Sequence, residues 1–269
     1  MAVRMLTLMI LILSLKAQAE DGLKKVYDLL EQTKLGDLEL QKARDLKISI
    51  EQGTVSKTDV TATRLATGAR ETYQFNTKVI VDQSKDVVFQ ALDLAHELTH
   101  ATSAQNNPFD PELTALTYIE YGIESAGGEA QAIANECEVG KQLIDAKALV
   151  NVKQIQSRCQ FVWVTLSHPD EWKKSFYFMG QYYREFMKQV LSLNSSEATQ
   201  AEWLKKIDPK NPVFVSAVAH KPYPLALLEE YVTITHKVCE RAQKSEAGRQ
   251  PAQVMHLKER CAAIGTEIN

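Results

Sequence analysis

The clearest helical pattern in the sequence covers residues 84–100, which contain neither Gly nor Pro. Its apolar positions recur at spacings of four, three and four residues: Val87, Ala91, Leu94 and Leu98. This spacing places the apolar side chains along one face of a helix and leaves the other faces for polar groups. Either Ser84 or Asp86 is suited to cap the first turn. The pattern therefore predicts a half-buried helix.

Residues 55–83, just before this helix, carry a different pattern that is rich in β-branched side chains. Strands are predicted over residues 60–67, 71–75 and 78–82, with a turn at residues 67–69. We expect a small antiparallel sheet whose last strand, residues 78–82, leads directly into the helix.

Helical patterns cover most of the remaining chain. A helix is predicted over residues 110–125, because Asp110 can cap it and Pro111 suits the first helical position. A pair of glycines separates it from the next helix, which opens at Glu129. Further helices are predicted over residues 22–46 with a break near residues 35–36, and over residues 170–193, 224–242 and 252–264. The fold class predicted is α+β and predominantly α-helical, with a small antiparallel sheet before the helix of residues 84–100 and a helical C-terminal half.

The N-terminus has the pattern of a secretory signal peptide. Arg4 precedes an apolar run of 11 residues, and Ala17 and Ala19 form a small-residue cleavage site. An uncleaved anchor is the alternative, but a transmembrane helix needs about 20 apolar residues. We expect a mature chain that begins near Glu20, is exported to the periplasm or the extracellular space, and has no stable membrane insertion.

Charge and cysteine content narrow the class of protein further. The chain has 31 Lys and Arg against 34 Asp and Glu, and removal of residues 1–19 takes away two basic residues, which leaves a formal charge of −5. This balance argues against a nucleic-acid partner and against binding to an anionic membrane surface. An even number of cysteines in an exported chain favours two disulfides over free buried thiols. Of three possible connectivities, the simplest pairs Cys137 with Cys159 and Cys239 with Cys261, each closing a helix-loop-helix unit.

The polar face of the helix over residues 84–100 carries a candidate catalytic motif, HExxH. His96 and His100 are four residues apart, so both imidazoles lie on one helix face and can bind one metal ion. Glu97 stands about 100° further round the helix, beside the open position of the metal. Two histidines and an intervening acid in this spacing are typical of zinc hydrolases, in which the acid serves as general base.

A third ligand is expected, because hydrolytic zinc sites usually have three protein ligands. A downstream histidine in the pattern HExxHxxGxxH is excluded, since Ser103 and Asn106 occupy the required positions. The remaining candidates are the glutamates of the following helices: Glu112, Glu120, Glu124, Glu129, Glu136 and Glu138. Glu129 is preferred because it opens a helix after two glycines and is followed by small alanines that permit close helix packing. Glu124 and Glu136 stay as alternatives, and Glu136 or Asp93 could instead brace a ligand from outside the metal's coordination sphere.

Residues 60–140 resemble the core of the HExxH zinc metallopeptidases, the zincins, and in particular their glutamate-ligand branch, the gluzincins. The likeness rests on the order of sheet, HExxH helix and Glu-bearing helix. Ile133 departs from thermolysin-like members, which carry an Asp there, so the chain is more similar to poorly described bacterial metallopeptidases. The resemblance implies that residues 78–82 bind substrate by β-augmentation. It also implies that a Tyr or His assists the oxyanion, for which the candidates are Tyr118, Tyr121, His220 and Tyr223.

These observations predict an exported zinc metallopeptidase that acts on a peptide or protein. His96, His100 and Glu129 are expected to hold Zn²⁺, and Glu97 to act as general base on a zinc-activated water. The expected organisation is a signal peptide (1–19), an N-terminal helical segment (20–54), the metallopeptidase core (55–150) and a helical C-terminal region (151–269). Two alternatives stay open: an exported zinc-containing binding or interaction protein without catalysis, and a zinc amidase acting on non-protein amides such as cell-wall crosslinks.

Overall fold

The computed structural model describes seven stretches of the chain: residues 22–65, 72–103, 107–110, 112–148, 150–193, 197–244 and 251–266. The signal peptide predicted over residues 1–19 and the turn predicted at residues 67–69 lie outside these stretches. By its internal contacts the chain divides into two units. Unit 1 consists of Met1–Thr61, Asn76–Ser103 and Ala132–Val164, and unit 2 consists of Ala62–Phe75, Ala104–Gln131 and Thr165–Asn269.

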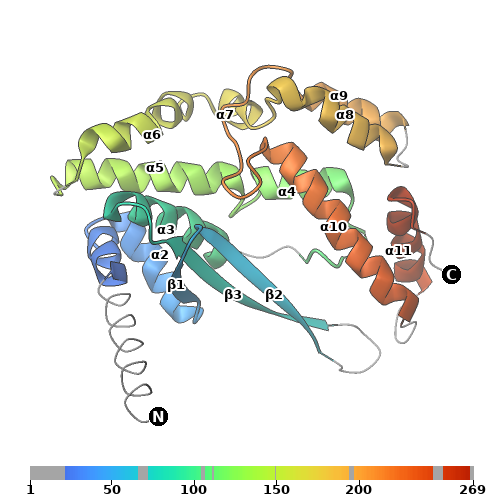
Figure 1. Ribbon diagram of the computed structural model, residues 1–269, viewed down its shortest axis with the longest axis horizontal. Coiled ribbons are helices and arrows are strands. Elements are labelled where there is room, and N and C mark those ends of the chain that lie inside the picture. The colour runs from blue at the N-terminus through green and yellow to red at the C-terminus, as the bar shows by residue number, and fades with distance from the viewer. Residues whose placement is uncertain are drawn as a thin grey trace, which may run out of the picture. The chain divides into compact units, whose positions relative to one another are not determined.

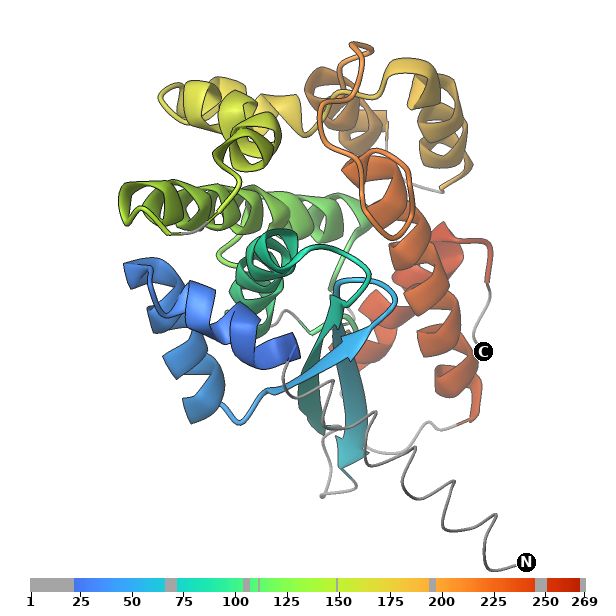
Figure 2. The same ribbon diagram turned by 60° about the vertical axis from the view of Figure 1, so that its left-hand side comes forward.

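Unit 1 combines several helices with a three-stranded sheet (Figures 1 and 2). A first helix covers residues 22–30. The other helices of this unit are α2 (Lys34–Asp45), α3 (Val87–Thr102), α5 (Glu129–Asp145, from its second turn on) and α6 (Val152–Thr165, except its last residue). The strands are β1 (Ser49–Gly53), β2 (Lys57–Leu65) and β3 (Thr72–Asp82), and β2 and β3 extend beyond the unit at one end.

The strands are ordered β1-β3-β2, so β3 is the central strand. Strand β1 pairs with β3 in parallel, with Ser49 opposite Lys78 and Gly53 opposite Asp82. The predominantly helical α+β fold is confirmed, but the sheet is mixed, and the prediction of an antiparallel sheet was wrong for β1. The short, polar β1 sequence carries no strand pattern that marks it in advance. The prediction of two strands over residues 71–82 was also wrong, because the polar residues at 76 and 77 continue the single strand β3.

Helix α3 is held on the sheet by its apolar face. Asp86 caps it and accepts a hydrogen bond of 3.1 Å from the backbone N–H of Phe89. Ala91, Leu94 and Leu98 are completely buried, which confirms the predicted apolar stripe. They belong to one core with residues of β3 and of helices α2, α5 and α6: Val79, Val81, Leu40, Ala43, Val139, Leu143 and Ile155. Each fully buried Leu contributes about 1.5–3 kcal/mol, so this packing fixes the helix that carries the HExxH motif.

Helices α5 and α6 pack closely against each other. A disulfide joins Cys137 of α5 to Cys159 of α6. At Gly140 of α5, an added Cβ would lie only 2.7 Å from Cγ2 of Ile155 on α6. Glycine is therefore required here for the two helices to approach as they do.

Unit 2 is mostly helical. Its helices are α4 (Ala115–Glu124), α7 (Pro169–Ser175), the 3₁₀ helix η1 (Gly180–Tyr182), α8 (Tyr183–Ser192), α9 (Glu197–Lys206), α10 (Tyr223–Lys244) and α11 (Pro251–Ala263). Helix α4 packs against α10. At Gly122 of α4 an added Cβ would lie 2.8 Å from Cδ1 of Leu227 on α10, so glycine permits this approach. The second disulfide joins Cys239 of α10 to Cys261 of α11, and both predicted pairings are confirmed.

Two helix predictions in unit 2 were wrong. Helix α4 begins at Ala115 rather than near Asp110, because Thr114 and Thr117 form a reciprocal capping box. Asp110 instead accepts a hydrogen bond from the backbone N–H of Glu112 in a local turn, and residue 111 lies outside the described stretches.

The single helix predicted over residues 170–193 is also interrupted. Residues 176–179 leave the helix because Phe178 forms a β-bridge with Asp208, and the N–H of Met179 donates to the carbonyl of Asp208. Gly180 follows with a φ of +51°, a conformation that glycine adopts without strain.

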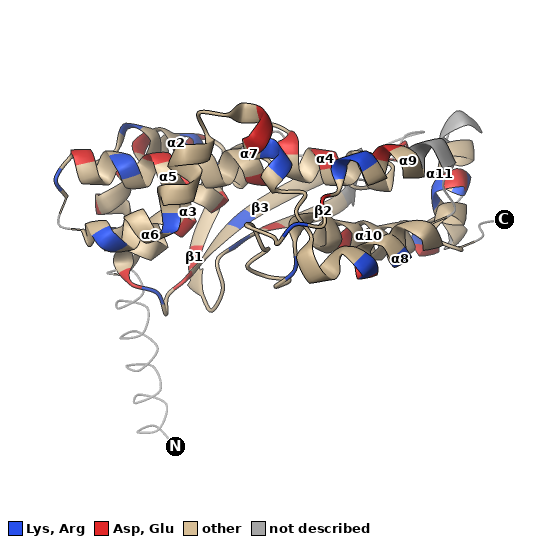
Figure 3. Cartoon of the chain, turned by 90° about the horizontal axis from the view of Figure 1, so that it is seen from above, with Lys and Arg blue, Asp and Glu red and all other residues tan. Residues whose placement is uncertain are grey.

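Acidic and basic residues are interspersed along the described helices in the view of Figure 3. Among the helices of the described stretches, none combines the length and the apolar composition that a bilayer crossing requires.

Candidate metal centre

His96 and His100 lie one turn apart on α3 and point their Nε2 atoms toward each other. The two nitrogens are 3.1 Å apart, and the rings meet edge to face with centroids 4.8 Å apart. Two imidazole nitrogens bound to one tetrahedral zinc at 2.0–2.1 Å would lie about 3.3 Å apart. The spacing of the two rings therefore matches that of a shared metal ion.

Glu129 lies beside this histidine pair. One ligand atom from each of His96, His100 and Glu129 falls within 4.8 Å of the others, and all three residues are half-buried. Glu129 is the first residue of α5, as the sequence predicted, and it comes two residues after Gly127, whose φ of +78° lies in the turn before the helix.

Glu97, the acid of the motif, is held by strand β2. The residue is buried, with 8% of its surface exposed. Oγ1 of Thr58 donates a hydrogen bond of 2.8 Å to Oε2 of Glu97 and also lies 3.0 Å from the backbone oxygen of Glu97. This contact orients the carboxylate through one of its two oxygens. Thr58 carried no signal in the sequence, because its role depends on how β2 lies against α3.

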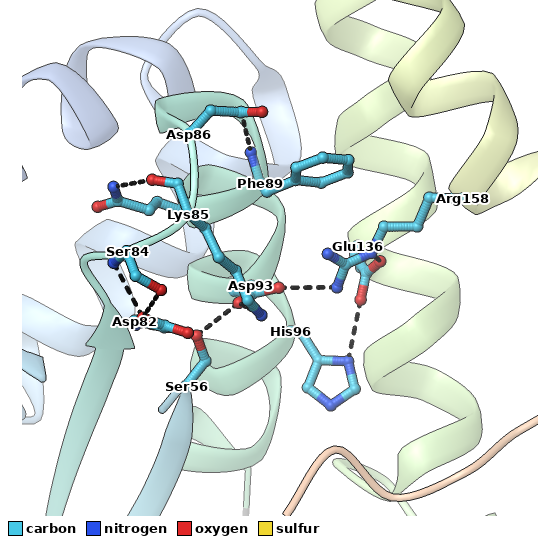
Figure 4. Close-up of polar contacts among 11 residues, drawn as sticks. Ser56, Asp82, Ser84, Lys85, Asp86, Phe89, Asp93, His96, Glu136 and Arg158 are labelled. Atoms are coloured by element: carbon cyan, nitrogen blue, oxygen red, sulfur yellow. Dashed lines mark hydrogen bonds and ion pairs between the residues drawn. The ribbon is translucent and has the colours of Figure 1, made fainter. Parts of the chain in front are cut away.

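Glu136 contacts the first histidine of the motif. Its Oε2 atom lies 3.2 Å from Nδ1 of His96 (Figure 4). A hydrogen bond from Nδ1–H to a carboxylate fixes the tautomer in which Nε2 keeps its lone pair for a metal. Glu136 is therefore placed to orient the ring of His96, as expected for one of the two roles that the sequence suggested for it.

Glu136 belongs to a group of charged residues that we call the Arg158 cluster, which consists of the buried Asp93 and Glu136 and the partly exposed Arg158 (Figure 4). Arg158 donates from Nε to Oε1 of Glu136 and from Nη2 to Oδ1 of Asp93, the latter at 2.8 Å. The side chains of Asp93 and Glu136 are each 4% exposed. The sequence suggested that Asp93 could brace a histidine. In the structure Asp93 is connected to His96 indirectly, through Arg158 and Glu136.

The charges of this cluster change the pKa values of Asp93 and Arg158. Burial alone would raise the pKa of Asp93, but the charge of Arg158 and hydrogen bonds from Lys85 and Ser56 outweigh it and lower the pKa. Ser56 Oγ and Lys85 Nζ each lie 2.5 Å from Oδ2 of Asp93. For Arg158, burial would lower the pKa, but the charges of Glu136 and Asp93 raise it above the usual value for arginine.

Glu124, an alternative third ligand, has other partners. It accepts a hydrogen bond of 2.5 Å from the hydroxyl of Tyr177 and lies 3.5 Å from Nζ of Lys206. Glu120 likewise pairs with Lys206. Glu120 and Glu124 of α4 thus both form ion pairs with Lys206 within unit 2.

The aromatic and histidine candidates for oxyanion stabilisation all lie in unit 2. Tyr118 forms a hydrogen bond with Glu230. Burial raises the pKa of Glu230, and the charge of Glu129 raises it further, against a lowering by the Tyr118 hydrogen bond. Tyr118 is thereby linked through Glu230 to Glu129.

The other three candidates have local roles. Tyr121 is 47% exposed. His220 adopts a φ of +54° in a turn, and its N–H donates to the carbonyl of Ser216. Tyr223 packs near the ring of Phe176.

A second group of potential ligands is formed by Glu136, Cys137 and Cys159. Both sulfur atoms are joined in the disulfide, so neither offers a thiolate to a metal. In the described part of the chain, the group formed by His96, His100 and Glu129 is thus the one with a donor set suited to a metal. The chain matches no protein-family model, no curated protein and no solved structure.

Proposed function

We propose that the protein is a zinc-dependent metallopeptidase. The observation that carries the proposal is the convergence of His96, His100 and Glu129, whose ligand atoms lie within 4.8 Å of one another on two helices. Glu97 is the residue next to the first of these ligands and is held in place by Thr58.

The donor set fits zinc on chemical grounds. Two neutral imidazoles and one carboxylate form a common ligand set of catalytic zinc, and the fourth tetrahedral position is then open to water or substrate. One anionic ligand leaves the site with a net charge of +1. When bound there, Zn²⁺ would lower the pKa of water from about 15.7 to about 7 and polarise a peptide carbonyl.

The residues of the chain then have separate roles. Glu97 accepts the proton of the attacking water and passes it to the leaving amine. Thr58 keeps the Glu97 carboxylate oriented through its hydroxyl. Glu136 holds the ring of His96 through Nδ1.

The sheet restricts how an extended substrate would bind. The resemblance to zincins pointed to residues 78–82, but β3 has β1 on one side and β2 on the other, so its two edges are already paired. The edge strand that contacts the motif helix is β2, through Thr58 and Glu97. We therefore assign substrate pairing by β-augmentation to β2 instead.

Export to an oxidising compartment is part of the proposal. Two disulfides are formed by the four cysteines, and disulfides persist mainly outside the cytosol. The N-terminal sequence supplies the pattern of a leader peptide.

The experiment compares the parent chain with the Glu97→Gln variant, both purified with zinc and assayed on an unstructured protein substrate. The expected result is zinc bound in equal amount by both proteins, chelator-sensitive cleavage by the parent, and at least a thousandfold lower kcat in the variant. The Glu138→Gln variant is the matched control, because Glu138 is an exposed acid of α5. Undiminished cleavage by Glu97→Gln would refute Glu97 as the base, and a parent that binds zinc without cleaving peptides or other amides would indicate a binding protein.

A further inference from the structure

We infer that Arg158 is a positioning residue of the zinc site, acting through Glu136 to fix the ring of the ligand His96. The inference rests on the proposed zinc site and goes beyond it, because it assigns part of the metal affinity to a residue on α6 that contacts no ligand.

The contacts run from α6 through α5 to α3 (Figure 4). The two oxygens of Glu136 have different partners: Oε1 accepts from Nε of Arg158, and Oε2 lies 3.2 Å from Nδ1 of His96. A carboxylate held at both oxygens has one orientation, so Arg158 determines where Oε2 stands. The position of Oε2 in turn determines the rotation of the imidazole.

Arg158 also connects Glu136 to the motif helix itself. Its Nη2 atom donates to Asp93, which lies on α3 less than one full turn before His96. The guanidinium therefore bridges two buried carboxylates on two helices from two of its nitrogens. Its plane lies over the ring of Phe89, with Cζ 5.7 Å from the ring centroid. A lysine, which has one ammonium group and no planar fork, cannot reproduce this geometry.

Burial explains why the bridge matters. Asp93 and Glu136 are nearly inaccessible to water, and a buried carboxylate that loses its hydrogen-bond and charge partners is strongly destabilised. Lys85 and Ser56 also contact Asp93, whereas among the described residues the basic side chain that forms an ion pair with Glu136, apart from His96, is Arg158. Loss of Arg158 would therefore affect Glu136 more than Asp93.

An independent feature places Arg158 beside Glu136. Each member of this ion pair is followed directly in the sequence by a cysteine, and these two cysteines, Cys137 and Cys159, form the disulfide between α5 and α6. Gly140 permits the same close approach one turn later. The covalent bond thus determines the register of α6 on α5 at the level of the ion pair.

The expected consequence is an effect on metal affinity. Partners that orient a metal-binding histidine typically account for 10–100-fold in affinity or activity. The Arg158→Met variant should bind zinc about 10–100-fold more weakly than the parent, measured by competition with a chelator of known affinity. The visible spectrum of the cobalt-substituted protein should change with it. Arg158→Lys keeps the positive charge but lacks the planar guanidinium, so its zinc affinity should lie between those of the parent and Arg158→Met. Arg158→Lys also tests the inference if Arg158→Met does not fold.

The control is Arg260→Met, which removes a guanidinium that is buried among residues of unit 2 and should leave zinc affinity and the cobalt spectrum unchanged. Parental affinity and an unchanged spectrum in both Arg158 variants would overturn the inference. A readout that needs no metal is the ¹⁵N spectrum of the imidazole of His96. The parent should show the Nδ1–H tautomer and the Arg158 variants a mixture, and a parent that already shows the mixture would also overturn the inference. A parent that binds zinc but cleaves no substrate would contradict the peptidase proposal while leaving the effect of Arg158 measurable.

Discussion

The hydroxyl of Thr58 lies 2.8 Å from Oε2 of Glu97, so a side chain of strand β2 orients the acid of the HExxH motif on α3. A hydrogen bond to a charged group contributes about 1.5–3 kcal/mol. If that energy is lost from the transition state, Thr58→Val should lower kcat about tenfold or more while zinc content stays unchanged.

Thr58→Ser retains the hydroxyl and should recover most of the activity, which separates the hydrogen bond from a packing effect. The control is Thr233→Val on α10, where the hydroxyl lost is exposed and donates to the backbone oxygen of Glu229. Equal kcat values for Thr58→Val and the parent would show that Glu97 does not depend on this contact.

The assignment of the third ligand is tested by comparing two glutamates. Glu129→Ala removes the carboxylate that is grouped with His96 and His100. Zinc affinity should fall by more than about a hundredfold, which exceeds the 10–100-fold typical of losing a residue that only orients a ligand. Glu124→Ala removes a carboxylate that pairs with Tyr177 and Lys206, and should leave zinc affinity unchanged. The measurement is chelator competition, and stoichiometric tight zinc in Glu129→Ala would assign the ligand to another residue.

The two disulfides provide a matched pair, because each joins cysteines separated by 22 residues. On the basis of loop entropy, removing either one should lower the free energy of unfolding by about 3 kcal/mol. The double replacement of Cys137 and Cys159 by Ser should in addition weaken zinc binding, because it releases α6 and with it Arg158.

The same replacement of Cys239 and Cys261 should leave zinc binding unchanged. Urea denaturation gives the free energy of unfolding, and chelator competition gives the zinc affinity. Equal zinc affinity in the two double variants would show that the disulfide between α5 and α6 has no influence on the site.

The contribution of Asp93 to the free energy of unfolding should be lost at low pH. Burial raises its pKa, but Arg158, Lys85 and Ser56 together lower it below the value of the unfolded chain, which is about 3.9. A group with a lowered pKa contributes its full stability above the unfolded pKa and loses it as the pH falls through the folded pKa. At neutral pH, Asp93→Asn should therefore lower the free energy of unfolding by about 3 kcal/mol, as expected for a broken buried ion pair.

The difference between the parent and Asp93→Asn should decrease below about pH 4. Urea denaturation of the metal-free proteins at pH 7, 5 and 3 measures it. The control is Asp145→Asn at the exposed end of α5, for which a small and constant difference is expected. A difference for Asp93→Asn that stays constant or increases toward pH 3 would contradict the lowered pKa.

The sequence by itself determined the features that depend on local spacing. The apolar stripe of α3 and the four-residue separation of His96 and His100 follow from the 3.6-residue period of a helix. The start of α5 at Glu129 follows from the two glycines before it, and the disulfide pairs follow from short-range separation along the chain.

Only the tertiary structure decided the features that join distant segments. The parallel pairing of β1 with β3 depends on how the strands are arranged in space. Because of this pairing β3 is a central strand, and β2 is an edge strand of the sheet. The contacts of Thr58 with Glu97 and of Arg158 with Glu136 join residues 39 and 22 positions apart. No periodicity in a sequence encodes such contacts, because they depend on which helix faces are buried against each other and on which polar groups must then be satisfied inside the core.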